Sequence, residues 1–192
     1  MDNIDTVLAI ITGIGLSAAC GFRIFVPLLL LSLVSNYGLV NLSPEFEWIG
    51  SNYALMAFAT ATVFEVIAYY IPWLDNLMDT IASPISVIAG IIASASVITD
   101  IPPVMKWLVA IIAGGGIAGI MQGATTALRA KSSLFTGGIG NPVLSTSELV
   151  MSAMVSAFAI VLPLIGFIFV LALGGVLFIK VGKSIFRRRK SN

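Results

Sequence analysis

Long apolar stretches separated by short polar ones dominate the hydropathy pattern of this chain. A helix of about 20 mainly apolar residues crosses the hydrocarbon core of a bilayer. Five stretches reach or approach that length, and they cover residues 6–34, 53–73, 84–99, 107–129 and 149–179. The pattern therefore predicts an all-α, polytopic transmembrane bundle of about five spans.

The first and the fifth stretch are longer than one straight span needs. Gly21 and Pro27 are break points for the first, and Pro163 and Gly166 for the fifth, because such residues interrupt or kink helices. Each of these two stretches is therefore either one bent span or a hairpin. The stretch 84–99 is short and is interpreted as a partial span.

Polar segments connect the apolar stretches. Residues 74–83 read "LDNLMDTIAS", and we interpret them as a connection. Residues 130–148 include "TGGIGNP", whose glycines and proline predict a loop. The connection at 100–106 holds two prolines, which end one helix and start the next.

Composition supports the membrane interpretation. The chain is 58% hydrophobic and 10% charged, whereas soluble domains have about a quarter of their residues charged. We therefore expect a single integral membrane domain over residues 1–192. A net charge of +1 provides no general attraction for nucleic acid. With no histidine and one cysteine, Cys20, the chain lacks the ligands of a structural zinc site, and we expect no cofactor.

Basic residues concentrate in the tail 180–192. We expect the protein in an inner or plasma membrane, and the positive-inside rule places this tail on the cytoplasmic side. There the tail is expected to bind anionic lipids. Five spans then put the N-terminus outside. If the stretch 149–179 is two passes, the N-terminus is inside instead.

Small residues recur every four positions in the first and the fourth stretch. The two series superpose without a gap and place Arg23 on Arg129. We interpret this as an internal repeat with halves 6–75 and 107–180, linked by the helix 84–99. Three crossings separate the halves, so the repeat is expected to be inverted, as in many transporters. The small residues allow close helix packing. They are Ala9, Gly13, Ser17, Gly21, Gly115, Gly119, Gly123 and Ala127.

An arginine, Arg23, lies inside the first apolar stretch. An ionisable group at bilayer depth costs at least about 2.5–3.5 kcal/mol on insertion scales, so it usually faces protein or water. Glu65 is the carboxylate inside a predicted span and is the expected salt-bridge partner of Arg23. Two alternatives remain open: an anion site formed by Arg23 and Arg129, and extension of the Arg23 side chain to a membrane surface.

Asp75 and Asp79 are four residues apart and share one face if their segment is helical. Such a pair can hold Mg²⁺ for a pyrophosphate substrate, which makes these residues weak metal candidates and raises a lipid-phosphate enzyme as a hypothesis. The alternatives are a solvated amphipathic connector and a helix that lies on the surface.

Three segments together resemble a known family. They are "GFRIFVPLL", "FEVIAYYIPWLDNLMDTIASP" and "GGIGNPVLSTSE". Over nearly its whole length the chain is similar to the prokaryotic membrane family called domain of unknown function 4126. The resemblance implies an integral membrane protein of this size and no established activity. It directs attention to Arg23, Asp75, Asp79, Asn141, Pro142 and Glu148.

The leading functional hypothesis is a small transporter, or a lipid-carrier flippase, for an anionic substrate. Its expected substrate-binding residues are Arg23, Glu65, Arg129, Asn141 and Glu148. So few helices favour a homodimer. The alternative is a non-transporting structural or assembly protein whose glycine-rich helices pack against partners, and we expect no enzymatic activity.

Overall fold

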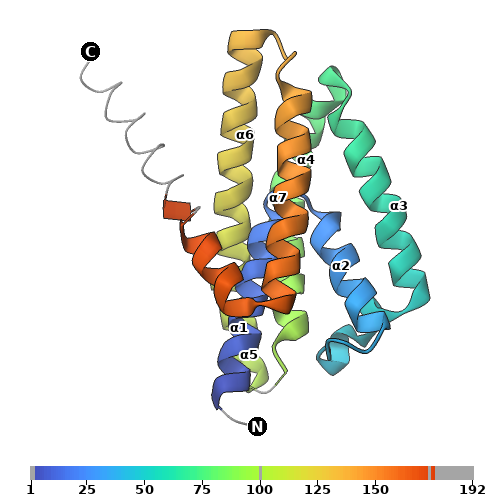
Figure 1. Cartoon of the computed structure of the whole chain (residues 1–192), viewed down its shortest axis with the longest axis vertical. Helices are drawn as coiled ribbons and strands as arrows, with labels where there is room; N and C mark the ends of the chain where they lie inside the picture. Colours follow the sequence, from blue (N-terminus) through green and yellow to red (C-terminus); the bar gives the residue numbers. More distant parts are fainter. Residues whose placement is uncertain (1–2, 100, 173, 176–192) are drawn as a thin grey trace.

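The structure is a computed structural model that describes residues 3–99, 101–172 and 174–175 (Figure 1). Within this part the chain is helical and has no strand, so the predicted all-α class is confirmed. The elements are α1 (Asn3–Cys20), α2 (Phe25–Asn36), η1 (Pro44–Gly50), α3 (Asn52–Tyr69), α4 (Pro72–Val97), α5 (Pro103–Val109), η2 (Ala110–Gly115), α6 (Gly116–Thr136) and α7 (Asn141–Val161).

Four helical segments of the described part are long and apolar enough to cross a membrane, which makes the chain a multi-pass membrane protein. They are Asn52–Tyr69, Leu77–Val97, Pro103–Thr136 and Asn141–Val161. Three apolar helices are shorter, namely Ile4–Cys20, Phe25–Asn36 and Pro163–Ala172. The difference from the expected five spans arises because the first apolar stretch is divided into two helices, each shorter than a span.

The first apolar stretch is a hairpin, in which α2 runs back alongside α1 (Figure 1). The chain leaves α1 at Gly21, whose N–H donates to the carbonyl of Ala18 at 3.1 Å. A Cβ at Gly21 would lie 2.6 Å from the backbone oxygen of Ala118 and 2.5 Å from Cβ of Met121. Only glycine lets the hairpin tip approach α6 this closely.

The fifth stretch is also broken. Helix α7 ends at Val161, and a short helix over Pro163–Ala172 follows. A Cβ at Gly166 would lie 2.9 Å from the backbone nitrogen of Ala159, so the short helix folds back against the end of α7. The remainder of the predicted stretch and the basic tail 180–192 lie outside the described residues.

Two predicted connections are largely helical, which corrects the sequence interpretation. Residues 74–83 form the first part of α4, and Pro84 lies inside that helix rather than at its start. The stretch 84–99 is therefore not a partial span. Residues 130–136 continue α6, so the loop shrinks to the turn at 137–140, where Gly137 and Gly138 have φ of 62° and 90°.

The two helices of the proposed repeat run in the same direction. Ser17 of α1 lies beside Gly114, because a Cβ on Gly114 would be 3.0 Å from its Oγ, and Gly21 lies beside Ala118. The contact positions advance in the same direction along both helices, from Ser17 to Gly21 and from Gly114 to Ala118, so the helices are parallel (Figure 1). The expected inverted orientation is therefore wrong for this pair. The α1–α2 hairpin adds a pass that the sequence count of three crossings left out.

The small residues of α1 pack mainly on α4. A Cβ at Gly13 would lie 2.8 Å from Oγ of Ser94. One turn further on, Ser17 donates a hydrogen bond of 2.6 Å to the carbonyl of Gly90. Backbone-to-backbone approach of this kind is what small residues at four-residue spacing allow.

The glycines of the second series also face α4, but over a shorter length. A Cβ at Gly115 would lie 2.9 Å from Ile91, and one at Gly119 would lie 3.2 Å from Val87. The series therefore meets α4 rather than forming a continuous ribbon against α1. Three members of the two series are outside these close contacts, with Gly123 and Ala127 exposed and Ala9 half-buried.

Candidate functional site

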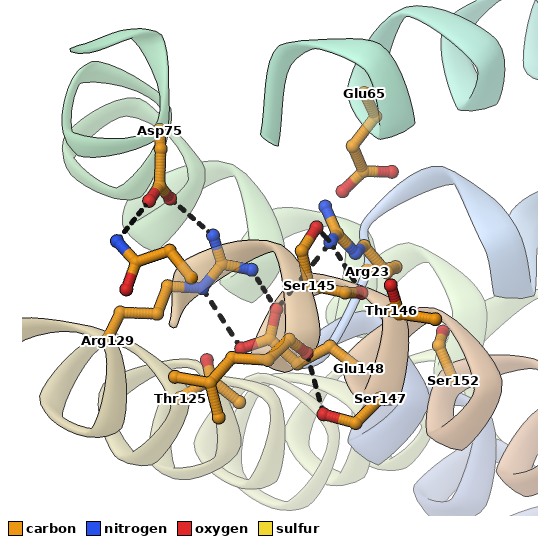
Figure 2. A network of polar contacts seen from close by, with 12 residues as sticks. Arg23, Glu65, Asp75, Thr125, Arg129, Ser145, Thr146, Ser147, Glu148 and Ser152 are labelled. Carbon is orange, nitrogen blue, oxygen red and sulfur yellow. Dashed lines mark hydrogen bonds and ion pairs between the residues drawn. The ribbon is translucent and has the colours of Figure 1, made fainter. Parts of the chain in front are cut away.

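Six ionisable side chains gather where the tip of the α1–α2 hairpin meets α3, α4, α6 and α7, and Figure 2 labels all of them except Asp79. None of these residues is more than 8% exposed. We call this group the charge cluster, and its members are Arg23, Glu65, Asp75, Asp79, Arg129 and Glu148. The sequence analysis singled out each of them, and the structure brings all six together although they come from five separate parts of the fold.

Arg129 on α6 is the centre of the charge cluster. Its Nε donates to Oε1 of Glu148 at 3.0 Å, and its Nη2 donates to the other oxygen of that carboxylate. Its Nη1 lies 2.5 Å from Oδ1 of Asp75 and 3.8 Å from Oδ1 of Asp79. A planar guanidinium suits such two-point bonding, and here it joins α4, α6 and α7.

Asn141, the first residue of α7, completes the surroundings of Asp75. Its Nδ2 donates to Oδ2 of Asp75 at 2.6 Å and to Oγ of Ser133 at 2.9 Å. Both carboxylate oxygens of Asp75 are therefore hydrogen-bonded. This arrangement excludes the solvated connector that was one reading of Asp75 and Asp79, since both residues are buried.

Arg23 occupies the hairpin tip between α1 and α2. Its Nη2 donates to the carbonyl of Ser145 at 2.9 Å and also to the Ser145 hydroxyl. Oε2 of Glu148 lies 3.7 Å from the same nitrogen. The ring of Tyr69 contacts both arginines, with centroid distances of 4.1 Å to Arg23 and 3.9 Å to Arg129. Such cation–π contacts stabilise cations away from water.

Two donors of Arg23 have no hydrogen-bond partner. The Nε and Nη1 atoms are buried and unpaired, although the residue is only 1% exposed. A buried donor without a partner carries a desolvation cost of about 1–3 kcal/mol, and more when the group is charged. These two nitrogens are therefore free to donate hydrogen bonds to a ligand oxygen.

Glu65 does not form the salt bridge with Arg23 that its position in the sequence predicted. Among the described residues, the carboxylate within 4 Å of Arg23 is that of Glu148. The Glu65 oxygens instead accept from the backbone N–H of Ile24 at 2.8 Å and of Phe25 at 3.1 Å. These N–H groups exist as free donors because the chain breaks before α2 and leaves a helix N-terminus.

The charge cluster holds four carboxyl groups and two guanidinium groups. With every group ionised it therefore carries two more negative than positive charges. Unbalanced charge in a low-dielectric interior is strongly unfavourable, and titratable groups there take up or release protons instead. The cluster therefore holds two more carboxyl than guanidinium groups, and the N–H groups before α2 offset part of that excess at Glu65.

An apolar cavity of about 360 Å³ adjoins the charge cluster between α2, α3 and α4. Glu65 is the ionisable residue among the described residues that line it. The other lining residues are Phe25, Ala61, Phe64, Ile67, Ala68, Leu74 and Met78.

No group of three or more histidine, cysteine or acidic residues in the described part is arranged to hold a metal ion. The carboxylates of Asp75 and Asp79 face the guanidinium of Arg129 instead.

Sequence reasoning missed two residues of this site, Tyr69 and Ser145. Tyr69 lies four residues after Glu65, and Ser145 lies three residues before Glu148. Residues at these spacings share a helix face. If both segments are taken as helical, the sequence therefore predicts Tyr69 beside Glu65 and Ser145 beside Glu148.

The family model described as Domain of unknown function (DUF4126) matches residues 10–183, which include the whole charge cluster. Neither the search of curated proteins nor that of solved structures returned a match.

Proposed function

Because the chain belongs to the DUF4126 family and is a multi-pass membrane protein, we propose that it is a small transporter of an anionic substrate. The charge cluster is the proposed binding site, and protons are the proposed balancing charge. The observation that carries the proposal is the pair of buried, unpaired N–H donors on Arg23 beside a surplus of carboxyl groups.

The proposed exchange follows from the charges. An anion that binds Arg23 competes with the carboxylates that already surround the two guanidinium groups. A carboxylate displaced in this way stays buried, and it is tolerated there as the neutral, protonated acid. Substrate binding is therefore linked to proton uptake, and release of the substrate returns the proton.

The α1–α2 hairpin is the proposed moving element. It carries Arg23 at its tip, and its helices are shorter than a span. Non-helical backbone at membrane depth is tolerated where it is buried in protein or lines a polar cavity, as at the break between the two helices. Movement of the tip away from Ser145 would open the charge cluster.

A second candidate function is a structural or assembly protein. The closed state of the charge cluster favours it, because Asp75 and Arg129 are sealed from solvent and bonded to each other. Replacing a buried ionic network with apolar residues often leaves the stability of the fold unchanged or raises it, however. Stability alone therefore does not explain why six ionisable groups are buried here.

Three further features belong to this proposal and rest on the sequence. They are an inner or plasma membrane location, a cytoplasmic tail 180–192 that contacts anionic lipids, and a homodimer.

Two-sided accessibility tests the proposal. In a Cys20→Ser background, Ser145→Cys places a thiol at the Arg23 contact, and Ser152→Cys is the matched control because both serines are fully buried on α7. We expect an impermeant maleimide to label position 145 in vesicles of either orientation, at least about tenfold faster than position 152. Labelling of position 145 from one side only, or at the rate of position 152, contradicts transport through the cluster.

A further inference from the structure

We infer that the substrate is an amphiphile, with an anionic head group bound at the tip of the α1–α2 hairpin and an apolar chain held in the cavity between α2, α3 and α4. This inference rests on the proposed function and names the chemical class of the substrate.

The cavity has the size and chemistry of a site for an apolar chain. Its volume of about 360 Å³ falls in the range of about 300–1,000 Å³ that is usual for ligand sites. Side chains such as Ala61, Leu74 and Met78 line it. Phe64 and Ile67, also in the lining, are 68% and 53% exposed and lie on a membrane-spanning helix. The cavity therefore faces the lipid, and a chain enters it sideways from the bilayer.

Groups that bind an anion lie next to two of the lining residues, Glu65 and Phe25. The first turn of α2 presents the N–H groups of Ile24 and Phe25, and both donate to the carboxylate of Glu65. A helix N-terminus favours negative charge because its N–H groups are unpaired and its dipole is positive there. The Glu65 carboxylate thus occupies the position of an anionic ligand in this closed arrangement.

Arg23 supplies an independent sign of a ligand site. It precedes the first turn of α2 directly, and its buried Nε and Nη1 have no partner. Figure 2 shows the Glu65 carboxyl group extending towards the Arg23 guanidinium. A phosphate or carboxylate head group placed here can use the unpaired Arg23 donors and the two backbone N–H groups together, which Glu65 alone does not.

Glu65 joins the two parts of the site, since it lines the cavity and also fills the anion position. The surface of the cavity is apolar, so a head group reaches the N–H groups of α2 only by displacing this carboxylate. Protonation of Glu65 removes the repulsion and frees the N–H groups of α2 for the head group. The substrate therefore enters laterally and replaces an internal carboxylate.

Native mass spectrometry of the whole protein in a non-ionic detergent tests this inference with dioctanoyl phosphatidate as the probe. Glu65→Gln keeps the shape and removes the competing charge, so we expect at least about fivefold tighter binding. Ala61→Trp fills the cavity, and we expect at least about fivefold weaker binding. The matched control, Ala57→Trp, lies on the exposed face of the same helix and should bind like the unaltered protein.

Opposite shifts in two folded variants cannot arise from general loss of structure. Unchanged binding in Ala61→Trp, or weaker binding in Glu65→Gln, overturns the inference. Equal binding of inorganic phosphate or of dioctanoyl phosphatidylcholine overturns it as well, since the first needs no chain and the second carries no net charge. If two-sided labelling at position 145 persists in that case, the transporter proposal stands without a lipid substrate.

Discussion

At the scale of single residues, Arg129 explains how so many acidic groups remain buried. Its guanidinium lies within 4 Å of three carboxylates, from Asp75, Asp79 and Glu148. The residue types were readable from the sequence, because a charge in or beside an apolar stretch is conspicuous. The pairing was not readable, since it depends on how α4, α6 and α7 come together. Glu65 shows the same limit, because its partners are backbone N–H groups that a break in the chain creates.

Replacing Arg129 with Gln should therefore be strongly destabilising. The change leaves three buried carboxylates without their main positive partner, and removing one partner of a buried ion pair costs about 3–5 kcal/mol. The measurement is the free energy of unfolding in mixed detergent micelles titrated with dodecyl sulfate. Lys131→Gln is the control, because Lys131 is exposed on the same helix and should change stability little. Similar losses for both variants would contradict the central role of Arg129.

At the scale of elements, the breaks in the helices decide the architecture. Of the four break points in the sequence analysis, Gly21 and Pro163 lie where the chain leaves its helices. Pro27 and Gly166 do not, because Pro27 lies inside α2 and Gly166 inside the helix Pro163–Ala172. The sequence analysis could not tell a kink from a reversal, because that depends on which neighbour the glycine meets. The reversal at Gly21 needs the close approach to Ala118, a residue almost a hundred positions away. Residues 74–83 were misread as a connection because their polar side chains pair inside the protein.

Two glycines from the small-residue series offer a matched test of this packing. Gly21→Ala places a methyl group 2.6 Å from the backbone oxygen of Ala118, so we expect a loss of about 1–3 kcal/mol from overpacking. Gly123→Ala meets nothing within 4 Å and should be neutral or stabilising by up to about 1 kcal/mol, since alanine favours the helix. The same unfolding titration measures both. Equal effects of the two substitutions would show that the hairpin tip is not held tightly against α6.

At the scale of the whole molecule, the helices bring the charge cluster to the tip of an internal hairpin and place an apolar cavity beside it. Fold class and membrane character followed from composition and hydropathy, which are properties of the whole chain. The relative direction of α1 and α6 did not, because one extra reversal changes it. The inverted orientation was therefore wrong for α1 and α6. The six charged residues that the sequence analysis singled out nevertheless lie together in the structure.

The most direct test of the account is the transbilayer movement of a fluorescent phosphatidate in vesicles that contain the purified protein. Dithionite bleaches the probe in the outer leaflet, and the bleaching of inner-leaflet probe reports movement. We predict movement at least about tenfold faster than in protein-free vesicles, no such acceleration for fluorescent phosphatidylcholine, and loss of the acceleration in Ala61→Trp but not in Ala57→Trp. Phosphatidate movement no faster than in protein-free vesicles would contradict lipid transport by this protein.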